Sequence, residues 1–182
     1  MEDWQKDYQH GTLVIWPTGD AARVSNQLRM LHDPQTHEYC SAHITVTQPF
    51  RSPPTDHTWS LIDQIVQATP PFWIHVGPIE FFGQSSIVKF DVEPKSVINS
   101  LRQQLHATGL FNLTLPHTDG FTPHMTISES GLPADGADAT TVEVLNTLYE
   151  TMQFRASRLT YIRPDPSFCF HEERSFAFGL SS

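Results

Sequence analysis

Cysteine is scarce in this chain, with only Cys40 and Cys169 among its 182 residues. Two cysteines are too few for the disulfide framework of a small secreted protein, and their spacing fits no zinc-binding motif. We therefore expect two free thiols. A nucleophilic Cys40 acting with His43 is a weak alternative, because nothing else in the sequence indicates an activated thiolate.

Basic residues are also few: Lys and Arg number 11 against 20 Asp and Glu, which gives a formal net charge of −9 at pH 7. Binding of duplex DNA or long RNA without sequence preference depends on the neutralisation of many phosphates, so this composition argues against it. A small phosphate ester or the end of an RNA strand remains compatible, because a local basic pocket is enough to hold it.

Long hydrophobic runs are missing, so we expect no membrane-spanning helix. The polar start Met1-Glu2-Asp3 is not typical of a signal peptide, and we expect a cytoplasmic protein. Apolar residues still make up 38% of the chain and include 12 Phe, which allows a sizeable core. At this length we expect one domain with two lobes over residues 1–182, acting as a monomer.

Hydrophobic periodicity predicts strands and helices that alternate along the chain. In the first helix, Val24, Leu28 and Leu31 are spaced for one buried face. The second and fifth strands are each followed by a helix and two strands, which predicts an α+β fold with two similar halves. We expect strands over residues 12–16, 43–50, 72–82, 86–92, 124–128, 154–162 and 175–180, helices over 19–31, 94–107, 140–152 and between Pro54 and Pro70, and a loop over 131–136.

Two segments repeat one pattern of histidine, apolar residue, threonine, apolar residue and hydroxyl residue. Because successive side chains on a strand point to opposite faces, each segment would bury its apolar residues and present histidine and hydroxyls on the other face. Two imidazoles brought together can act as acid and base in one reaction. The segments are Ala42-His43-Ile44-Thr45-Val46-Thr47 and Pro123-His124-Met125-Thr126-Ile127-Ser128.

The tripeptide His-x-Thr is not specific by itself, since the chain contains four copies, at His10, His43, His106 and His124. Only His43 and His124 lie in a strand pattern with apolar residues after both the histidine and the threonine. They are 81 positions apart, which leaves room for one lobe between them. The competing interpretation is a pair of strand histidines that simply bond to neighbouring hydroxyls.

Through these two motifs the chain resembles the 2H phosphoesterase superfamily, which includes the 2′-5′ RNA ligase-like proteins and cyclic nucleotide phosphodiesterases. Chain length and element order extend the resemblance over most of the sequence, although residue-level support is confined to the two motifs and Pro123. The chain departs from the family in having Ala42 where Pro is common. It also reads Ser128-Glu129-Ser130 where several ligase-like members carry an Arg.

The resemblance implies a bilobal fold in which two sheets, related by pseudo-twofold symmetry, line a central cleft. It also implies that His43 serves as general acid and His124 as general base in the hydrolysis of a 2′,3′-cyclic phosphate to a 2′-phosphate. Thr45 and Thr126 would hold the phosphoryl oxygens. Neither a metal nor another cofactor is required in this scheme.

The expected partner is a nucleotide or RNA end that carries the cyclic phosphate, and its base would need an aromatic face to stack on. For each aromatic candidate, core packing is the competing explanation. The candidate substrate contacts are Phe50, Phe81, Phe82, Phe121 and Tyr161 for stacking, Arg51, Arg155 and Arg158 for the phosphate, and Ser128 on the same strand face as His124.

Two alternatives use the same cleft. One is an enzyme that cleaves, or in reverse ligates, linear 2′-5′ linked oligonucleotides. The other is a module that binds a nucleotide or RNA end without turnover. Catalysis needs both imidazoles in complementary protonation states, whereas binding should survive the loss of one.

Overall fold

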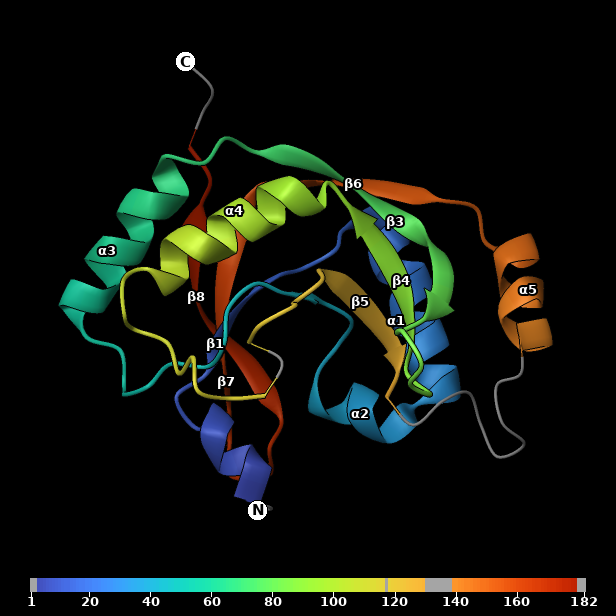
Figure 1. Ribbon diagram of the computed structural model, residues 1–182, viewed down its shortest axis with the longest axis horizontal. Helices are drawn as coiled ribbons and strands as arrows, with labels where there is room; N and C mark the ends of the chain where they lie inside the picture. The colour runs from blue at the N-terminus through green and yellow to red at the C-terminus, as the bar shows by residue number, and fades with distance from the viewer. Residues whose placement is uncertain (1–2, 117, 130–138, 180–182) are drawn as a thin grey trace.

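Eight strands form one curled sheet in which every described pairing is antiparallel, in the order β6-β3-β4-β5-β2-β1-β7-β8 (Figure 1). This computed structural model describes residues 3–116, 118–129 and 139–179. The strands are β1 (Thr12–Ile15), β2 (Ile44–Thr45), β3 (Phe72–Phe81), β4 (Val88–Glu93), β5 (His124–Ser128), β6 (Met152–Ala156), β7 (Arg158–Pro164) and β8 (Phe170–Ala177). The helices are the 3-10 helix η1 (Asp3–Tyr8), α1 (Gly19–His32), α2 (Pro34–Tyr39), α3 (Asp56–Gln67), α4 (Lys95–His106) and α5 (Ala139–Leu148).

The sheet has two halves that meet at the pair β2–β5. Outward from this seam, one half runs β2-β1-β7-β8 and the other runs β5-β4-β3-β6. The two sheets expected from the sequence are therefore two halves of one continuous, curled sheet. The α+β fold with two related halves is the expected one.

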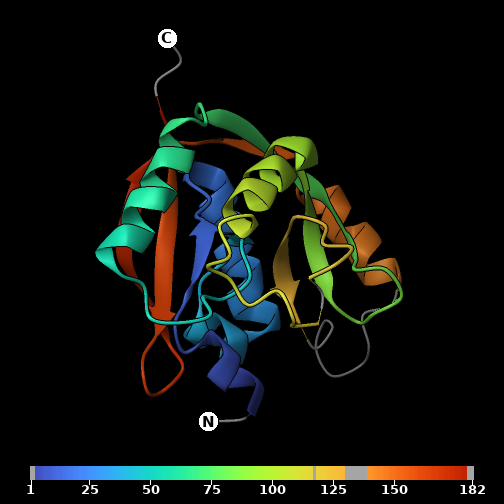
Figure 2. The same ribbon diagram turned by 60° about the vertical axis from the view of Figure 1, so that its left-hand side comes forward.

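Helices cover each half of the sheet. In Figure 1, α3 and α4 lie side by side over the half that contains β8, whereas α1 lies behind β4 and β5. Figure 2 shows the same arrangement from the side, with α3 and α4 next to each other at the top. The helix that follows β1 therefore contacts the half that contains β5. One cluster of buried side chains joins the helices to the sheet, including Leu13, Ile44, Phe90 and Met125 from the strands and Leu28, Ile62 and Leu101 from the helices.

The structure corrects three of the predicted elements. The strand predicted over 154–162 is two strands, β6 and β7, which lie in opposite halves of the sheet. Its apolar alternation changes phase at Ser157, where the chain crosses between the halves. The strand predicted over 43–50 is confined to two residues, because the N–H groups of Val46 and Thr47 both donate to the Leu13 carbonyl. A short helix, α2, begins at Pro34, where the sequence predicted only an end to α1.

Helix α1 is also rotated slightly from the predicted face. Its buried positions include Ala21, Ser25, Leu28 and Arg29, so the buried stripe passes to Arg29 and leaves Leu31 66% exposed. The loop predicted over 131–136 lies outside the described residues.

Arg29 is a buried cation that ties α1 to both motif-bearing segments. Its side chain is 3% exposed. Its Nε donates to the Cys40 carbonyl at 3.1 Å, Nη1 donates to the Thr126 carbonyl at 3.2 Å, and Nη2 donates to the Thr36 carbonyl at 3.4 Å. One guanidinium therefore satisfies backbone acceptors from α2, the approach to β2, and β5.

We expect Arg29→Met to lower the free energy of unfolding by about 2–4 kcal/mol, because it removes three hydrogen bonds from a buried charged donor to backbone carbonyls. Arg23→Met is the matched control on the same helix. Arg23 is exposed and pairs only with Asp20 among the described residues, so its loss should change the free energy by less than about 0.5 kcal/mol. Urea unfolding followed by circular dichroism would measure both values, and equal effects would contradict this role of Arg29.

Candidate active site

The pairing of β2 with β5 brings the two motifs together on one face of the sheet. Ile44 lies opposite Met125 in the antiparallel register. One step to either side, this register places His43 opposite Thr126 and Thr45 opposite His124, at a Cα separation of about 4.5–5.5 Å. Ile44 and Met125 are both 0% exposed, whereas the two histidines and two threonines are partly exposed.

Both imidazoles are oriented in the same way. The Nδ1–H of His43 donates to the Ser41 carbonyl at 2.7 Å, and the Nδ1–H of His124 donates to the Thr122 carbonyl at 2.8 Å. In each case the acceptor belongs to the residue two positions earlier. A neutral imidazole that donates through Nδ1 carries its lone pair on Nε2. Each histidine therefore presents Nε2 as the atom that can accept or deliver a proton.

Burial favours the neutral form of both histidines. It is the main reason that the pKa of His43 falls to about 4; the bond to Ser41 opposes the shift, and the positive charges of Arg29 and His124 support it. Burial also lowers the pKa of His124, with Lys89 acting in the same direction and Asp91 opposing it. Because the charge of His124 affects the pKa of His43, the two rings belong to one electrostatic site.

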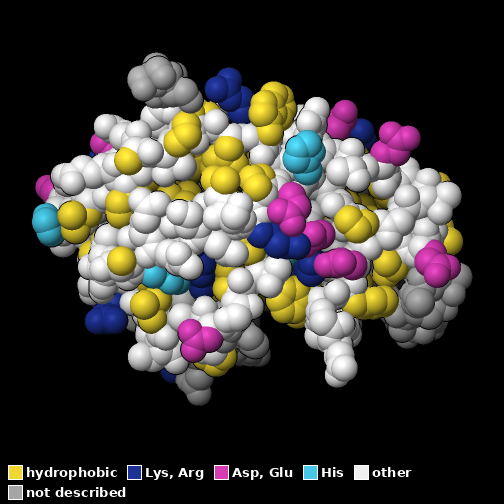
Figure 3. All heavy atoms as spheres, turned by 45° about the horizontal axis from the view of Figure 1, so that its top comes forward, with side chains coloured by type: hydrophobic (Ala, Val, Ile, Leu, Met, Phe, Trp, Pro, Cys, Tyr) yellow, Lys and Arg dark blue, Asp and Glu magenta, His cyan; other side chains and the backbone are white. Residues whose placement is uncertain are grey.

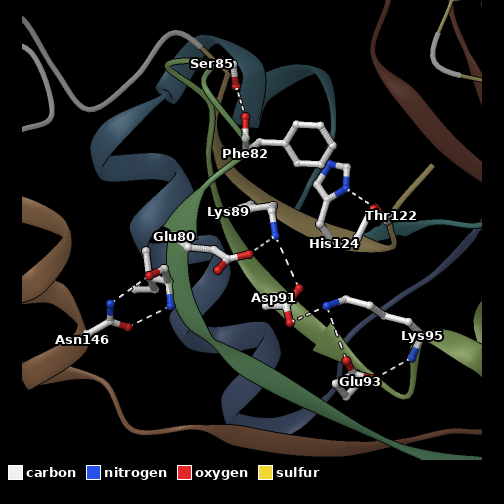
Figure 4. Close-up of polar contacts among 11 residues, drawn as sticks. Glu80, Phe82, Ser85, Lys89, Asp91, Glu93, Lys95, Thr122, His124 and Asn146 are labelled. Atoms are coloured by element: carbon white, nitrogen blue, oxygen red, sulfur yellow. Dashed lines mark hydrogen bonds and ion pairs between the residues drawn. The ribbon is translucent and has the colours of Figure 1, made fainter. Parts of the chain in front are cut away.

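Charged residues on β4 flank His124, and the sequence analysis missed them. The register places Asp91 opposite His124 and Lys89 opposite Thr126. The Lys89 side chain is 4% exposed. Its Nζ donates to Glu80 Oε1 at 2.6 Å and to Asp91 Oδ1 at 3.4 Å, while Lys95 Nζ donates to Asp91 Oδ2 at 2.8 Å (Figure 4). The alternation of charged and apolar residues in Val88–Glu93 was the available signal.

Aromatic rings lie next to both histidines. Phe82 packs against His124 with ring centroids 4.7 Å apart, as Figure 4 shows. Phe121 is 6.3 Å from the same imidazole, and the Arg102 guanidinium lies 3.9 Å from the Phe121 ring centroid. Trp16 meets His43 edge to face at 5.7 Å. Phe82 and Phe121 are thus the predicted stacking residues that the structure places beside the motifs.

Three other predicted contacts are core positions. Phe50 and Tyr161 are each 2% exposed and pack edge to face on one another at 5.5 Å. The Tyr161 hydroxyl donates to the His10 carbonyl at 3.0 Å. Ser128 is 0% exposed. Their burial removes all three from the candidate substrate contacts.

Arg51, predicted as a phosphate contact, is exposed and donates through Nη2 to the Phe111 carbonyl at 3.4 Å. This bond directs it toward the backbone of the loop after α4 rather than toward either histidine. On the face that Figure 3 presents, Lys and Arg side chains lie beside Asp and Glu side chains.

A cavity of about 270 Å³ opens beside His43. His43, Thr45 and Thr12 lie on its sheet side, and its lining also includes Arg29 of α1, Glu129 after β5, and residues of η1, α2 and the β7–β8 hairpin. The Cys40 thiol also lines it and lies 3.3 Å from His43 Nδ1. Burial raises the pKa of Cys40 to about 12, which argues against a thiolate nucleophile.

Among residues 3–116, 118–129 and 139–179, no group of three or more His, Cys, Asp or Glu side chains is arranged to hold a metal ion. Within the same ranges, no helix has the length and apolar character that crossing a membrane requires.

Residues 16–167 match the family model described as the 2′-5′ RNA ligase superfamily. No curated protein matches the chain. Among solved structures, TT0787 of Thermus thermophilus is similar, with a TM-score of 0.65 and 13% sequence identity. The matched region covers 94% of this chain and 98% of the TT0787 chain. E. coli LigT complexed with 3′-AMP is similar with a TM-score of 0.57 and 14% sequence identity. The matched region covers 93% of this chain and 97% of the LigT chain. At such identities these likenesses support the fold alone.

We expect the imidazole of His43 to titrate far below the ordinary histidine pKa of about 6.5, with a midpoint near pH 4 in the folded protein. Burial disfavours the charged ring, so the sign of the shift is downward. A pH titration of the imidazole NMR signals, assigned with His43→Gln, would measure it. His124→Ala should raise the midpoint, because it removes a neighbouring positive charge. A midpoint at or above 6.5 would contradict the neutral assignment.

Proposed function

The chain belongs to the 2′-5′ RNA ligase superfamily, and from this premise we propose that it is a metal-independent phosphodiesterase that hydrolyses a 2′,3′-cyclic phosphate on a nucleotide or RNA end. The observation that carries the proposal is the matched geometry of His43 and His124. Each presents Nε2 on the same sheet face, and each lies opposite a threonine of the other motif. Hydrolysis of a phosphodiester needs one base, one acid and donors to the phosphoryl oxygens, and these four side chains supply that set.

In the proposed reaction, the cyclic phosphate lies over the β2–β5 seam. His124 Nε2 takes a proton from water as the water oxygen bonds to phosphorus. The bond from phosphorus to O3′ breaks, and His43 Nε2 gives its proton to O3′. The products are a 2′-phosphate and a free 3′-hydroxyl. The hydroxyls of Thr45 and Thr126 donate to the nonbridging oxygens, where negative charge accumulates. The order of acid and base is the one that the family resemblance implies.

The acid must be protonated, although burial lowers the pKa of His43 and so favours its neutral form. Binding of the substrate reverses this effect on the pKa of His43. A phosphodiester anion a few ångströms from both rings favours the imidazolium form and raises both pKa values. The site is therefore suited to an anionic substrate that brings about its own protonation state.

A nucleotide ligand agrees with the relatives, since E. coli LigT has been solved in complex with 3′-AMP and with ATP. The family description also favours one alternative, the cleavage or ligation of a linear 2′-5′ linkage. That reaction would use the same four residues and differ in the leaving group.

We expect His43→Ala and His124→Ala each to lower kcat by at least about 100-fold, because each removes one proton-transfer group. His75→Ala is the control, since His75 is exposed on β3 and should retain full activity. The assay would follow the four nucleoside 2′,3′-cyclic monophosphates and a short RNA ending in a cyclic phosphate, with a chelator present, and would separate 2′- from 3′-phosphate products.

Full activity in both histidine variants would overturn the proposed chemistry. Loss of wild-type activity in chelator would overturn metal independence. Turnover of a 2′-5′ dinucleotide but of no cyclic phosphate would replace this substrate with the alternative. Binding without any turnover would indicate a module that has lost or never had catalysis.

The pH dependence offers a second test. Because the bound phosphate raises the pKa of the acid, we expect the alkaline limb of kcat to lie at higher pH than the alkaline limb of kcat/KM. The first reports the enzyme–substrate complex and the second reports the free enzyme. Initial rates between pH 4 and 9 would give both profiles. Coincident alkaline limbs would show that the substrate does not raise the pKa of the acid.

A further inference from the structure

We infer that the cavity beside His43 is a nucleobase subsite that prefers guanine, with the Glu129 carboxylate as the group that reads the base. This inference rests on the proposed function, because it places the base next to a phosphate held over the β2–β5 seam. The cavity adjoins the seam directly, since His43 and Thr45 line it together with Glu129.

The walls of the cavity suit a flat ring. Four aromatic residues line it: the partly buried Tyr8, Tyr39 and Phe170, and the buried Phe168. Its volume of about 270 Å³ lies just below the range of roughly 300–1,000 Å³ typical of pockets for drug-sized ligands. A single base is therefore a suitable occupant, and aromatic faces hold bases whatever their sequence.

One wall is held in an unusual conformation. Phe168 has φ of +67°, a left-handed backbone that bulky residues rarely adopt. The turn that contains it is fixed by Asp165, whose Oδ1 accepts from the N–H of Ser167 at 2.8 Å and of Cys169 at 3.0 Å. Phe168 then packs edge to face on Tyr39 at 5.8 Å. Backbone strain of this kind is typical of ligand-binding positions.

Glu129 is positioned at the cavity by a buried carboxylate. The backbone N–H of Glu129 donates to Asp33 Oδ2 at 2.8 Å. Asp33 Oδ1 accepts from the N–H of Thr36 at 3.2 Å and from its hydroxyl at 2.6 Å, which caps α2. Because Asp33 is only 7% exposed and bonded on both oxygens, it fixes the backbone of Glu129 relative to α2.

The Glu129 carboxylate itself is left with open acceptors. Its ion-pair partner is Arg29, whose Nη2 lies 3.8 Å from Oε1, beyond hydrogen-bond distance. No residue of the described part of the chain donates a hydrogen bond to this carboxylate. Burial raises the pKa of Glu129, while the Arg29 charge opposes that shift and Asp33 adds to it. The side chain is 57% exposed, so a ligand can reach it.

The charges of the cavity favour a neutral ring over a second phosphate. Arg29 is engaged with three backbone carbonyls, and Glu129 places a negative group in front of it. An anion there would meet that carboxylate. A donor-rich base edge would instead satisfy it.

Guanine is the base that matches two open carboxylate oxygens. Its Watson–Crick edge offers two adjacent donors, N1–H and N2–H, which a carboxylate accepts in parallel. Adenine offers one donor beside an acceptor nitrogen, cytosine offers one amino group, and uracil offers one N–H between two carbonyls. Each of these bases leaves one carboxylate oxygen without a partner or places a lone pair against it.

The test is the ratio of kcat/KM values for guanosine and uridine 2′,3′-cyclic monophosphates, with inosine 2′,3′-cyclic monophosphate as the analogue that lacks only the 2-amino group. We expect guanosine to exceed inosine and uridine by about tenfold in the wild type, the size of one charge-assisted hydrogen bond. Glu129→Gln should reduce that ratio toward one. Glu38→Gln is the matched control, since Glu38 lies on α2 and is not part of the lining.

Tyr39→Ala separates stacking from base reading. Because stacking tolerates every base, we expect it to lower kcat/KM by about tenfold for all substrates and to leave the ratio unchanged. An unchanged guanosine preference in Glu129→Gln would overturn the inference. So would wild-type hydrolysis at equal rates for all bases, and in that case the proposed function would stand.

If the wild type hydrolyses none of these substrates, the proposed function fails and binding decides the subsite separately. Calorimetry with guanosine 2′-monophosphate and adenosine 2′-monophosphate would then measure the preference. Tighter binding of the guanosine compound that is lost in Glu129→Gln would support the subsite. Equal binding, or none, would overturn it.

Discussion

The pairing of Ile44 with Met125 is the constraint on which the rest of the structure depends. It joins the two halves of the sheet, and it also determines which side chains face each other across the seam. A slip of one residue would turn every side chain of one strand to the other face. Ile44 and Met125 are both 0% exposed, and this burial opposes such a slip. The slip would move an apolar side chain out of the core and a histidine into it.

Two buried arginines reinforce this seam from opposite sides. Arg29 of α1 donates to the Thr126 carbonyl in the second motif, and Arg102 of α4 donates to the Val46 carbonyl in the first at 2.8 Å. Each helix thus holds the motif strand of the other half. Arg29 and Lys89 also bring positive charge close to His43 and His124, respectively, and lower their pKa values.

The sequence was informative where a pattern is local and much less so where a contact is not. The period of two around His43 and His124 predicted their shared face, because alternation along a strand needs only neighbouring residues. Phe50 and Tyr161 were misjudged because an aromatic side chain beside the core and one beside the cleft look alike in sequence. Lys89 and Arg29 were missed because their roles depend on which strand pairs with which. Glu129 could be noticed only as a departure from the family, and its cavity is built by segments far from it in the chain.

The two halves of the site are alike in their hydrogen bonds and unlike in their neighbours, and in the proposed reaction this difference in neighbours would distinguish the acid from the base. Both imidazoles are held through Nδ1 by a carbonyl two residues earlier, so their geometry alone does not distinguish acid from base. On the His124 side, β4 places Lys89 and Asp91 next to the ring. On the His43 side, Trp16 and the cavity occupy the corresponding space. A base seated in that cavity would fix the ribose on the side of His43, which leaves the opposite side of the phosphate, next to His124, for the attacking water.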